Sequence, residues 1–457
     1  MKAVSGRARV AELSVAAWLL AAFFTILLLA GGASRSDVLG QVVTRTAAFL
    51  ILIAMLLTAD REAIRPCGAV PWLLAAVIAL PLMQLVPLPP GLWRALPGRE
   101  EVLLGLPASV QGDVWRPLSL SPGNTVNAAV SLIVPAVVLA LLCQLRPSER
   151  RWLPFFMLAL VAVSMVFGLL QFTGLQIEQQ LINYSADVRG TFANRNHFAL
   201  FLALGCLITP YVAVAGGRNL RWLREVAIGL LLLLLLTILF SGSRMGLLLA
   251  GLALVAGCLA VGERLAKAWR ERLRRVAIVG GGVIAVAVLF ASVQFQRAAS
   301  INRLSDAEIG EDMRVRALPT VLSMVREYAP AGDGLGTFDP VFRMHEPFGL
   351  LKPTYFNRAH NDLVEIVLDA GLPGLLIIVA ALLWWAVASW RVWRRRPEPE
   401  VAAARIGSAT IALVVLASVV DYPARTPLFM GVIVIAATLL AWGARVDHSG
   451  HVRASSL

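Results

Sequence analysis

Long apolar runs, repeated along the whole chain, are the sequence feature that most constrains its fold. About twelve of them approach or exceed the 18 to 20 residues that a helix needs to cross a hydrocarbon core about 30 Å thick. Of the 457 residues, 58% are hydrophobic and only 15% are charged, whereas about 25% of residues in soluble domains are charged. The sequence therefore predicts an all-α, polytopic integral membrane bundle, with residues 1–457 forming one membrane domain.

The expected spans lie at roughly 10–32, 41–59, 69–87, 124–145, 152–173, 195–216, 222–240, 244–262, 276–294, 371–391, 404–420 and 428–444. The first run is long for a cleavable signal peptide and many spans follow it, so we expect it to be a span. If the N-terminus is cytoplasmic, every inside connection is basic, as the positive-inside rule requires, and the C-terminus is cytoplasmic too. These basic connections also explain the net charge of +13 without a nucleic acid partner. The inside basic residues are Arg61, Arg65, Arg146, Arg150, Arg151, Arg218, Arg221, Arg224, Arg264, Lys267, Arg270, Arg272, Arg274, Arg275, Arg391, Arg394, Arg395 and Arg396.

The cysteines and histidines do not predict a metal site or a disulfide framework. The four cysteines are Cys67, Cys143, Cys206 and Cys258. They form no CxxC pair and lie in or beside apolar runs, so we expect small buried hydrophobic side chains. His345 and His360 share one loop, with no carboxylate or cysteine near them at ligand spacing. The interpretation therefore requires no metal and no cofactor.

Four segments outside the apolar runs carry most of the polar groups, and all four map to the outer face. They are residues 189–199 (RGTFANRNHFA), 241–246 (SGSRMG), 331–338 (AGDGLGTF) and 358–374 (RAHNDLVEIVLDAGLPG). The third segment is expected to form a tight turn instead of a phosphate-binding loop, because no lysine follows its glycines. It lies in the largest outer connection, 294–370, where residues 313–328 have helical spacing with a bend near Pro319. A shared face is what a single site would need.

In these four motifs and their order, the chain resembles the superfamily of O-antigen ligases and polymerases. These are membrane glycosyltransferases that act on glycans linked to polyprenyl pyrophosphate. The resemblance covers roughly residues 185–380. It implies a C-type glycosyltransferase-like bundle in the bacterial inner membrane, with 294–370 as a large periplasmic loop. The implied partners are the lipid-linked glycan donor, a glycan or lipid A core acceptor, and the lipid bilayer.

The reaction implied by the resemblance needs cations beside the leaving lipid pyrophosphate, which gains negative charge as the glycosidic bond breaks. Arginine suits this role because its planar fork binds phosphate oxygens bidentately. The candidates are Arg189, Arg195, Arg244 and Arg358. The alternative for Arg244 is snorkelling to the lipid headgroups, and for Arg189 it is an ordinary exposed loop charge.

His360 is the candidate base for the acceptor hydroxyl, and in the resembling family this histidine is implicated in catalysis. Asn361 or Asp362 can begin the helix that follows, and a helix N-terminus disfavours imidazolium, so we expect a neutral ring. The alternative is a buried histidine with a purely structural hydrogen bond. Asn196 and His197, at the start of the sixth span, are expected to support the site, although His197 also fits a structural role.

Asp362, Glu365 and Asp369 recur at helical spacing, and their simplest interpretation is a solvated acidic face. Asp362 alternatively orients the imidazole of His360. The sequence does not identify the acceptor, because a ligase, an exopolysaccharide or O-antigen polymerase, and a protein glycosyltransferase need the same donor site. A different class, a transporter or flippase of lipid-linked sugars, also fits twelve spans, but it predicts polar residues at mid-membrane depth.

Overall fold

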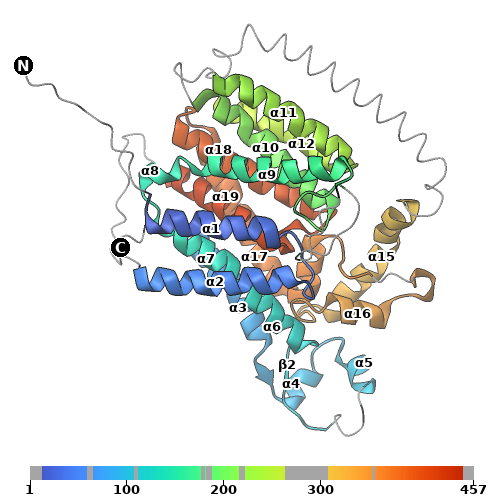
Figure 1. Ribbon diagram of the computed structural model, residues 1–457. Helices are drawn as coiled ribbons and strands as arrows, with labels where there is room; N and C mark the ends of the chain where they lie inside the picture. Colours follow the sequence, from blue (N-terminus) through green and yellow to red (C-terminus); the bar gives the residue numbers. More distant parts are fainter. Residues whose placement is uncertain are drawn as a thin grey trace, which may run out of the picture.

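The computed structural model describes residues 13–58, 65–105, 112–175, 188–215, 222–262, 307–351 and 356–445, together with residues 107 and 181. This described part is a bundle of helices that run side by side, with one short antiparallel strand pair, β1 (Pro87–Leu88) with β2 (Arg116–Pro117) (Figure 1). The prediction of an all-α, polytopic membrane protein is confirmed.

Apolar helices occupy every predicted span except 276–294, which lies outside the described residues. Nine helical stretches of the described chain are long and apolar enough to cross a membrane, while α1 and α3 are apolar but shorter. The helices of the bundle are α1 (Val15–Ala30), α2 (Leu39–Thr58), α3 (Val70–Gln84), α6 (Pro122–Ser131), α7 (Ile133–Gln144), α8 (Pro147–Arg150), α9 (Leu153–Phe172), α10 (Arg195–Ala215), α11 (Trp222–Phe240), α12 (Arg244–Val261), α17 (Asp362–Trp393), α18 (Pro399–Ser418) and α19 (Pro427–Arg445).

Helix α10 is the centre of the bundle, because its apolar residues are buried all round and it packs against α9, α11, α12 and α18. A helix that is apolar on every side is stable only where neighbours or lipid cover it. The crossing of α10 with α12 depends on Gly246, where a Cβ atom would lie 2.3 Å from the Cβ of Ala199. This close approach brings the two helix N-termini together.

The remaining elements gather at one end of the bundle (Figure 1). They are α4 (Pro90–Arg94), α5 (Arg99–Leu104), α15 (Ala307–Tyr328), α16 (Phe338–His345), η3 (Phe348–Leu350) and η4 (Pro423–Arg425). The backbone N–H of Leu120 donates to the carbonyl of Asp333 at 2.8 Å, and that of Ser119 donates to the carbonyl of Gln84 at 3.0 Å. The first bond ties the connection after α3 to the large loop, and the second ties it to the end of α3. The predicted helix at 313–328 is present as the second part of α15, with Pro319 inside it.

The expectation for the cysteines is wrong for one pair. Cys67 and Cys143 form a disulfide, with their Cα atoms 6.2 Å apart and a sequence separation of 76. The N–H of Arg65 donates to the carbonyl of Cys143 at 2.8 Å, so the segment before α3 lies along the end of α7. A spacing of 76 residues carries no pairing signal, and only the packing of the helices brings the two residues together. Cys206 is buried and Cys258 half-buried, as expected.

Candidate active site

Two histidines from distant parts of the chain share one carboxylate. His197 Nε2 and His360 Nδ1 each lie 3.6 Å from Oδ1 of Asp421. His197 comes from the first turn of α10, His360 from the residues before α17, and Asp421 from the connection between α18 and α19. The side chains of His197 and Asp421 are almost fully buried, whereas 17% of His360 is exposed. The site is therefore closed on one side and open at His360.

Asp421 is held in place by amides from the segment that carries His197. Its oxygens accept hydrogen bonds from Nδ2 of Asn196 at 2.8 Å, from Nδ2 of Asn194 at 3.0 Å and from the backbone N–H of Tyr422 at 3.0 Å. Burial would raise the pKa of Asp421, but the neighbouring imidazoles of His197 and His360 outweigh it and hold this pKa well below its usual range. The carboxylate thus stays charged at neutral pH.

His360 has an unusual backbone. Its φ of 51° is the only positive value among the non-glycine residues that the structure describes. Such a conformation costs on the order of 1–3 kcal/mol, and it persists where the surroundings enforce it. Here the ring lies 4.9 Å from the Tyr422 ring and 5.2 Å from the Phe356 ring, and Asn361 caps α17 by accepting from the N–H of Val364 at 3.0 Å. The cap that the sequence suggested thus fixes the chain directly after the histidine.

The expected solvated acidic face is wrong, because Asp362, Glu365 and Asp369 are all buried. Arg425 lies among them: its Nε donates to Asp362 Oδ1 at 3.2 Å, and its Nη2 is 3.1 Å from Glu365 and 3.6 Å from Asp369. The positive side chain explains how α17 tolerates three buried carboxylates, since buried charges require partners.

Two of the predicted site residues, Asp362 and Arg358, have partners in this network. Asp362 bonds to Ser418 at 3.0 Å and to Arg425, so the carboxylate beside His360 is that of Asp421. Arg358 Nη1 donates to Glu365 Oε1 at 2.9 Å, and the Ala359 N–H donates to the other Glu365 oxygen at 2.8 Å. Arg358 and Glu365 thus hold the backbone immediately before the histidine.

The glycine segment 331–338 forms the tight turn that was expected. Gly332, Gly334 and Gly336 all have positive φ, and the Gly334 N–H donates to the carbonyl of Asp369 at 2.9 Å. The Gly336 N–H donates to a carboxylate oxygen of Asp369 at 3.1 Å. The amides of the turn are used by α17, so the turn braces the helix that follows His360.

Arg195 and Arg244 begin two neighbouring helices. Both side chains are exposed, and each is the first residue of its helix, α10 and α12. Ser243 caps α12 by accepting from the N–H of Gly246 at 3.0 Å, and its hydroxyl donates to Asn196 Oδ1 at 2.9 Å. Arginine beside helix N-termini favours anions, because unpaired N–H groups and the helix dipole add to its charge.

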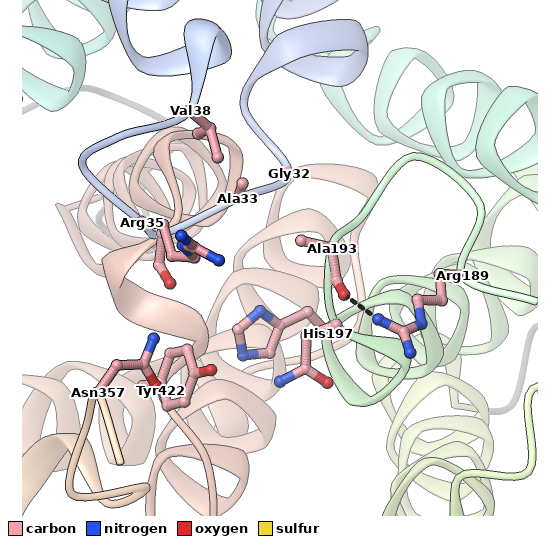
Figure 2. Close-up of a pocket in the computed structure, with 11 residues that line it drawn as sticks. Gly32, Ala33, Arg35, Val38, Arg189, Ala193, His197, Asn357 and Tyr422 are labelled. Atoms are coloured by element: carbon pink, nitrogen blue, oxygen red, sulfur yellow. Dashed lines mark hydrogen bonds between the residues drawn. The ribbon is translucent and has the colours of Figure 1, made fainter. Parts of the chain in front are cut away.

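Arg189 lies in a neighbouring pocket of about 190 Å³ (Figure 2). Its Nη1 donates to the carbonyl of Ala193 at 2.7 Å, and its backbone N–H donates to Gln171 at 2.9 Å. Arg35, from the connection between α1 and α2, faces the same space together with His197. The complete lining is Gly32, Ala33, Ser34, Arg35, Val38, Arg189, Ala193, Asn194, His197, Asn357 and Tyr422.

The fold and the site define a multi-pass helical membrane protein with a histidine–carboxylate cluster and several arginines at one end of its bundle. Residues 229–379 match the family described as O-antigen ligase. The match includes three of the four motif segments, and the resemblance to the O-antigen ligase and polymerase superfamily is confirmed. No curated protein sequence matches the chain. The family indicates a glycosyltransferase-like ligase or polymerase function in polysaccharide biosynthesis, with lipid-linked glycan substrates.

The sequence interpretation missed Asp421 and Arg425. Both lie in the short segment DYPAR between two apolar spans. A charged pair in such a short connection is a usable signal, because a charge between spans needs solvent or a partner. The interpretation of the sequence spacing also missed two carboxylates near His345. Glu327 Oε2 lies 3.0 Å from the Nε2 of His345, and Glu101 lies close by.

Proposed function

We propose that this protein transfers a glycan from polyprenyl pyrophosphate to an acceptor hydroxyl at the periplasmic face of a bacterial inner membrane. In this proposal the end of the bundle that carries the motif segments faces the periplasm, and both termini are cytoplasmic. The enzyme is an inverting glycosyltransferase whose chemistry uses no metal. The positive-inside pattern of the connections and the shared location of the motif segments support this orientation.

The observation that carries the proposal is the pair formed by His360 and Asp421. A carboxylate beside Nδ1 favours the tautomer with hydrogen on Nδ1, which makes Nε2 the basic nitrogen. The same carboxylate stabilises the positive charge that the ring gains when it accepts a proton, as in other histidine–carboxylate pairs. The partly exposed ring is therefore suited to activate a hydroxyl.

The donor is proposed to bind with its pyrophosphate at Arg195 and Arg244, with Arg189 on the adjoining wall. The first two arginines are exposed beside neighbouring helix N-termini, where anions are favoured. As the glycosidic bond breaks, the leaving pyrophosphate gains negative charge, and these cations stabilise it more than the intact donor. Asn196 supports both halves of the site, because it bonds to Asp421 and to Ser243.

The proposed step is a single displacement. The acceptor oxygen forms a bond to the anomeric carbon, while the bond from that carbon to the pyrophosphate oxygen breaks. The hydroxyl proton goes to His360 Nε2, and the electron pair leaves with polyprenyl pyrophosphate. Because attack and departure occur on opposite faces of the sugar, the configuration inverts. Arg358 and Asn361 hold the backbone on either side of His360, and His197 shares its carboxylate.

The test is a strain that carries only the His360→Ala protein, from which lipid-linked glycans are extracted and sized. Loss of transfer is expected, with accumulation of donor. Long polymer on the lipid carrier means that chains are built but not transferred, which identifies a ligase; single repeat units identify a polymerase.

The matched control is His448→Ala, in the C-terminal tail, which should transfer normally. A His360→Ala protein that reaches the membrane in normal amounts and retains full transfer would overturn the assignment of the base. Amounts are compared by immunoblotting of membranes, so that loss of protein is not mistaken for loss of chemistry.

A further inference from the structure

A second polar cluster lies where the connection between α3 and α6 meets the large loop, and it shares no residue with the candidate active site. Glu101 of α5, Glu327 of α15 and His345 of α16 each offer one ligand atom, and these atoms lie within 4.8 Å of one another. We propose that these three residues bind a divalent transition-metal ion such as Zn²⁺, which fastens α5 to the two loop helices.

The hydrogen bonding of His345 supports this proposal. Its Nδ1 lies 2.9 Å from the carbonyl of Val341, which can only accept, so the hydrogen of a neutral ring resides on Nδ1. Its Nε2 then presents a lone pair to the carboxylate of Glu327 at 3.0 Å. Two acceptors at this distance need a proton or a metal cation between them. A histidine that donates from one ring nitrogen to a backbone carbonyl and binds through the other is the usual arrangement at a metal.

A proton on Nε2 would satisfy Glu327 but not the second carboxylate, that of Glu101, which offers an oxygen within 4.8 Å of the other two ligand atoms. A divalent ion compensates both carboxylates at once. One imidazole and two carboxylates form a mixed nitrogen and oxygen donor set, which suits ions such as Zn²⁺ better than Mg²⁺, whose preferred ligands are all oxygen. Glu101 is exposed, which leaves a path for entry and room for water as a further ligand.

A buried hydroxyl beside the cluster is a second, independent indication of a ligand. Tyr328 is only 1% exposed, and its hydroxyl has no hydrogen-bond partner among the residues that the structure describes. Its ring meets the ring of His345 edge to face at 5.8 Å, and the phenol interacts electrostatically with Glu327 and Glu101. Buried hydroxyls are nearly always paired, so a water bound to a metal would supply the missing partner.

Arg99 is not the missing hydrogen-bond partner of the Tyr328 hydroxyl. Its guanidinium lies 5.9 Å from the Tyr328 ring and donates to the backbone carbonyls of Leu118 and Gly332. The arginine thus links α5 to the connection before α6 and to the large loop. The ion would complete the attachment of α5, since ion binding is coupled to the ordering of the segments that supply the ligands.

The test is direct Zn²⁺ binding by the purified full-length protein in detergent, measured by equilibrium dialysis and calorimetry. The protein carries a tag without histidines and the substitutions His448→Ala and His451→Ala, which remove the tail imidazoles. One equivalent of Zn²⁺ is expected to bind. Because Glu101 is exposed, Glu101→Gln should fold normally and weaken binding at least about tenfold, the order of effect seen on altering a metal's surroundings.

The matched control is Glu100→Gln, the exposed neighbour on the same short helix, which should bind Zn²⁺ as before. His345→Ala should abolish binding; if that variant does not fold, the comparison of Glu101→Gln with Glu100→Gln decides alone. Absence of saturable binding, or equal binding by these two glutamine variants, overturns the proposal.

Discussion

Replacing Asp421 by asparagine is the sharpest test of how the site works. The substitution keeps the shape of the side chain and removes its charge. In the present structure the carboxylate has two amide donors, one backbone donor and an imidazole nitrogen on each of two sides. Asparagine can accept part of these hydrogen bonds with its single oxygen, so we expect the variant to fold and the rate of transfer to fall.

The size of the effect follows from the 3.6 Å distance between Asp421 Oδ1 and His360 Nδ1. Opposite unit charges about 4 Å apart attract by about 4 kcal/mol at an effective dielectric constant of 20. This attraction exists only once the ring has accepted a proton, so it lowers the barrier and leaves the ground state largely unchanged. At about 1.4 kcal/mol for each factor of ten, its loss slows transfer by about a thousandfold.

The assay is transfer of a labelled lipid-linked glycan to acceptor by purified protein in liposomes. Asp421→Asn should lower kcat and change KM little, because the donor arginines are untouched. Asp113→Asn is the control, since Asp113 is an exposed aspartate paired with Arg94. A well-folded Asp421→Asn protein with kcat within about threefold of the wild type would refute the role of the carboxylate, because the Coulomb argument allows no such small effect.

The same residue predicts a pH dependence of stability. The folded protein holds the pKa of Asp421 well below its unfolded value of about 3.9. A carboxylate with a depressed pKa contributes stability that is fully present above the unfolded pKa and is lost as pH falls through the folded pKa. The difference in melting temperature between the wild type and Asp421→Asn should therefore be larger near pH 7 than in strong acid, where it should shrink.

Three further substitutions distinguish residues that stabilise the fold from a residue that is proposed to bind the donor. Arg425→Met leaves buried carboxylates without their cation and should destabilise the protein by about 3–5 kcal/mol, seen as loss of folded protein from membranes. Gly246→Ala places a Cβ against Ala199 and should cost about 1–3 kcal/mol in thermal unfolding, whereas Gly251→Ala on the same helix meets nothing within 4 Å and should be neutral; equal melting temperatures would contradict the close crossing. Arg244→Ala should weaken donor binding without lowering the melting temperature, and unchanged donor affinity in a binding assay would exclude it as a pyrophosphate contact.

The helices and the helix cap directly after His360 could be predicted from the sequence because local rules determine them. An apolar run of span length has one stable form in lipid, since each backbone N–H must find its acceptor within the segment. Asn361 as the cap of α17 follows equally from local chemistry, because its side chain replaces the missing backbone acceptor.

The network around His360 could not be predicted because its partners are distant in sequence. Asp421 lies 61 residues beyond His360 and comes to it only when α18 and α19 pack beside α17. The burial of Glu365 depends in the same way on Arg425, at the far end of two spans. Helical periodicity shows that acidic residues share a face, but the element that covers this face is a property of the packing.

The packing places the arginines in two different environments, one buried beside carboxylates and one exposed at helix N-termini. Arg358 and Arg425 have less than a fifth of their side chains exposed and are paired with carboxylates of α17. A phosphate that bound either one would have to displace Glu365 and leave that buried carboxylate uncompensated, at a cost of several kcal/mol. Arg195 and Arg244 are exposed at helix N-termini, where anions are favoured. The proposed donor site therefore rests on the exposed arginines, while Arg358 acts by positioning His360.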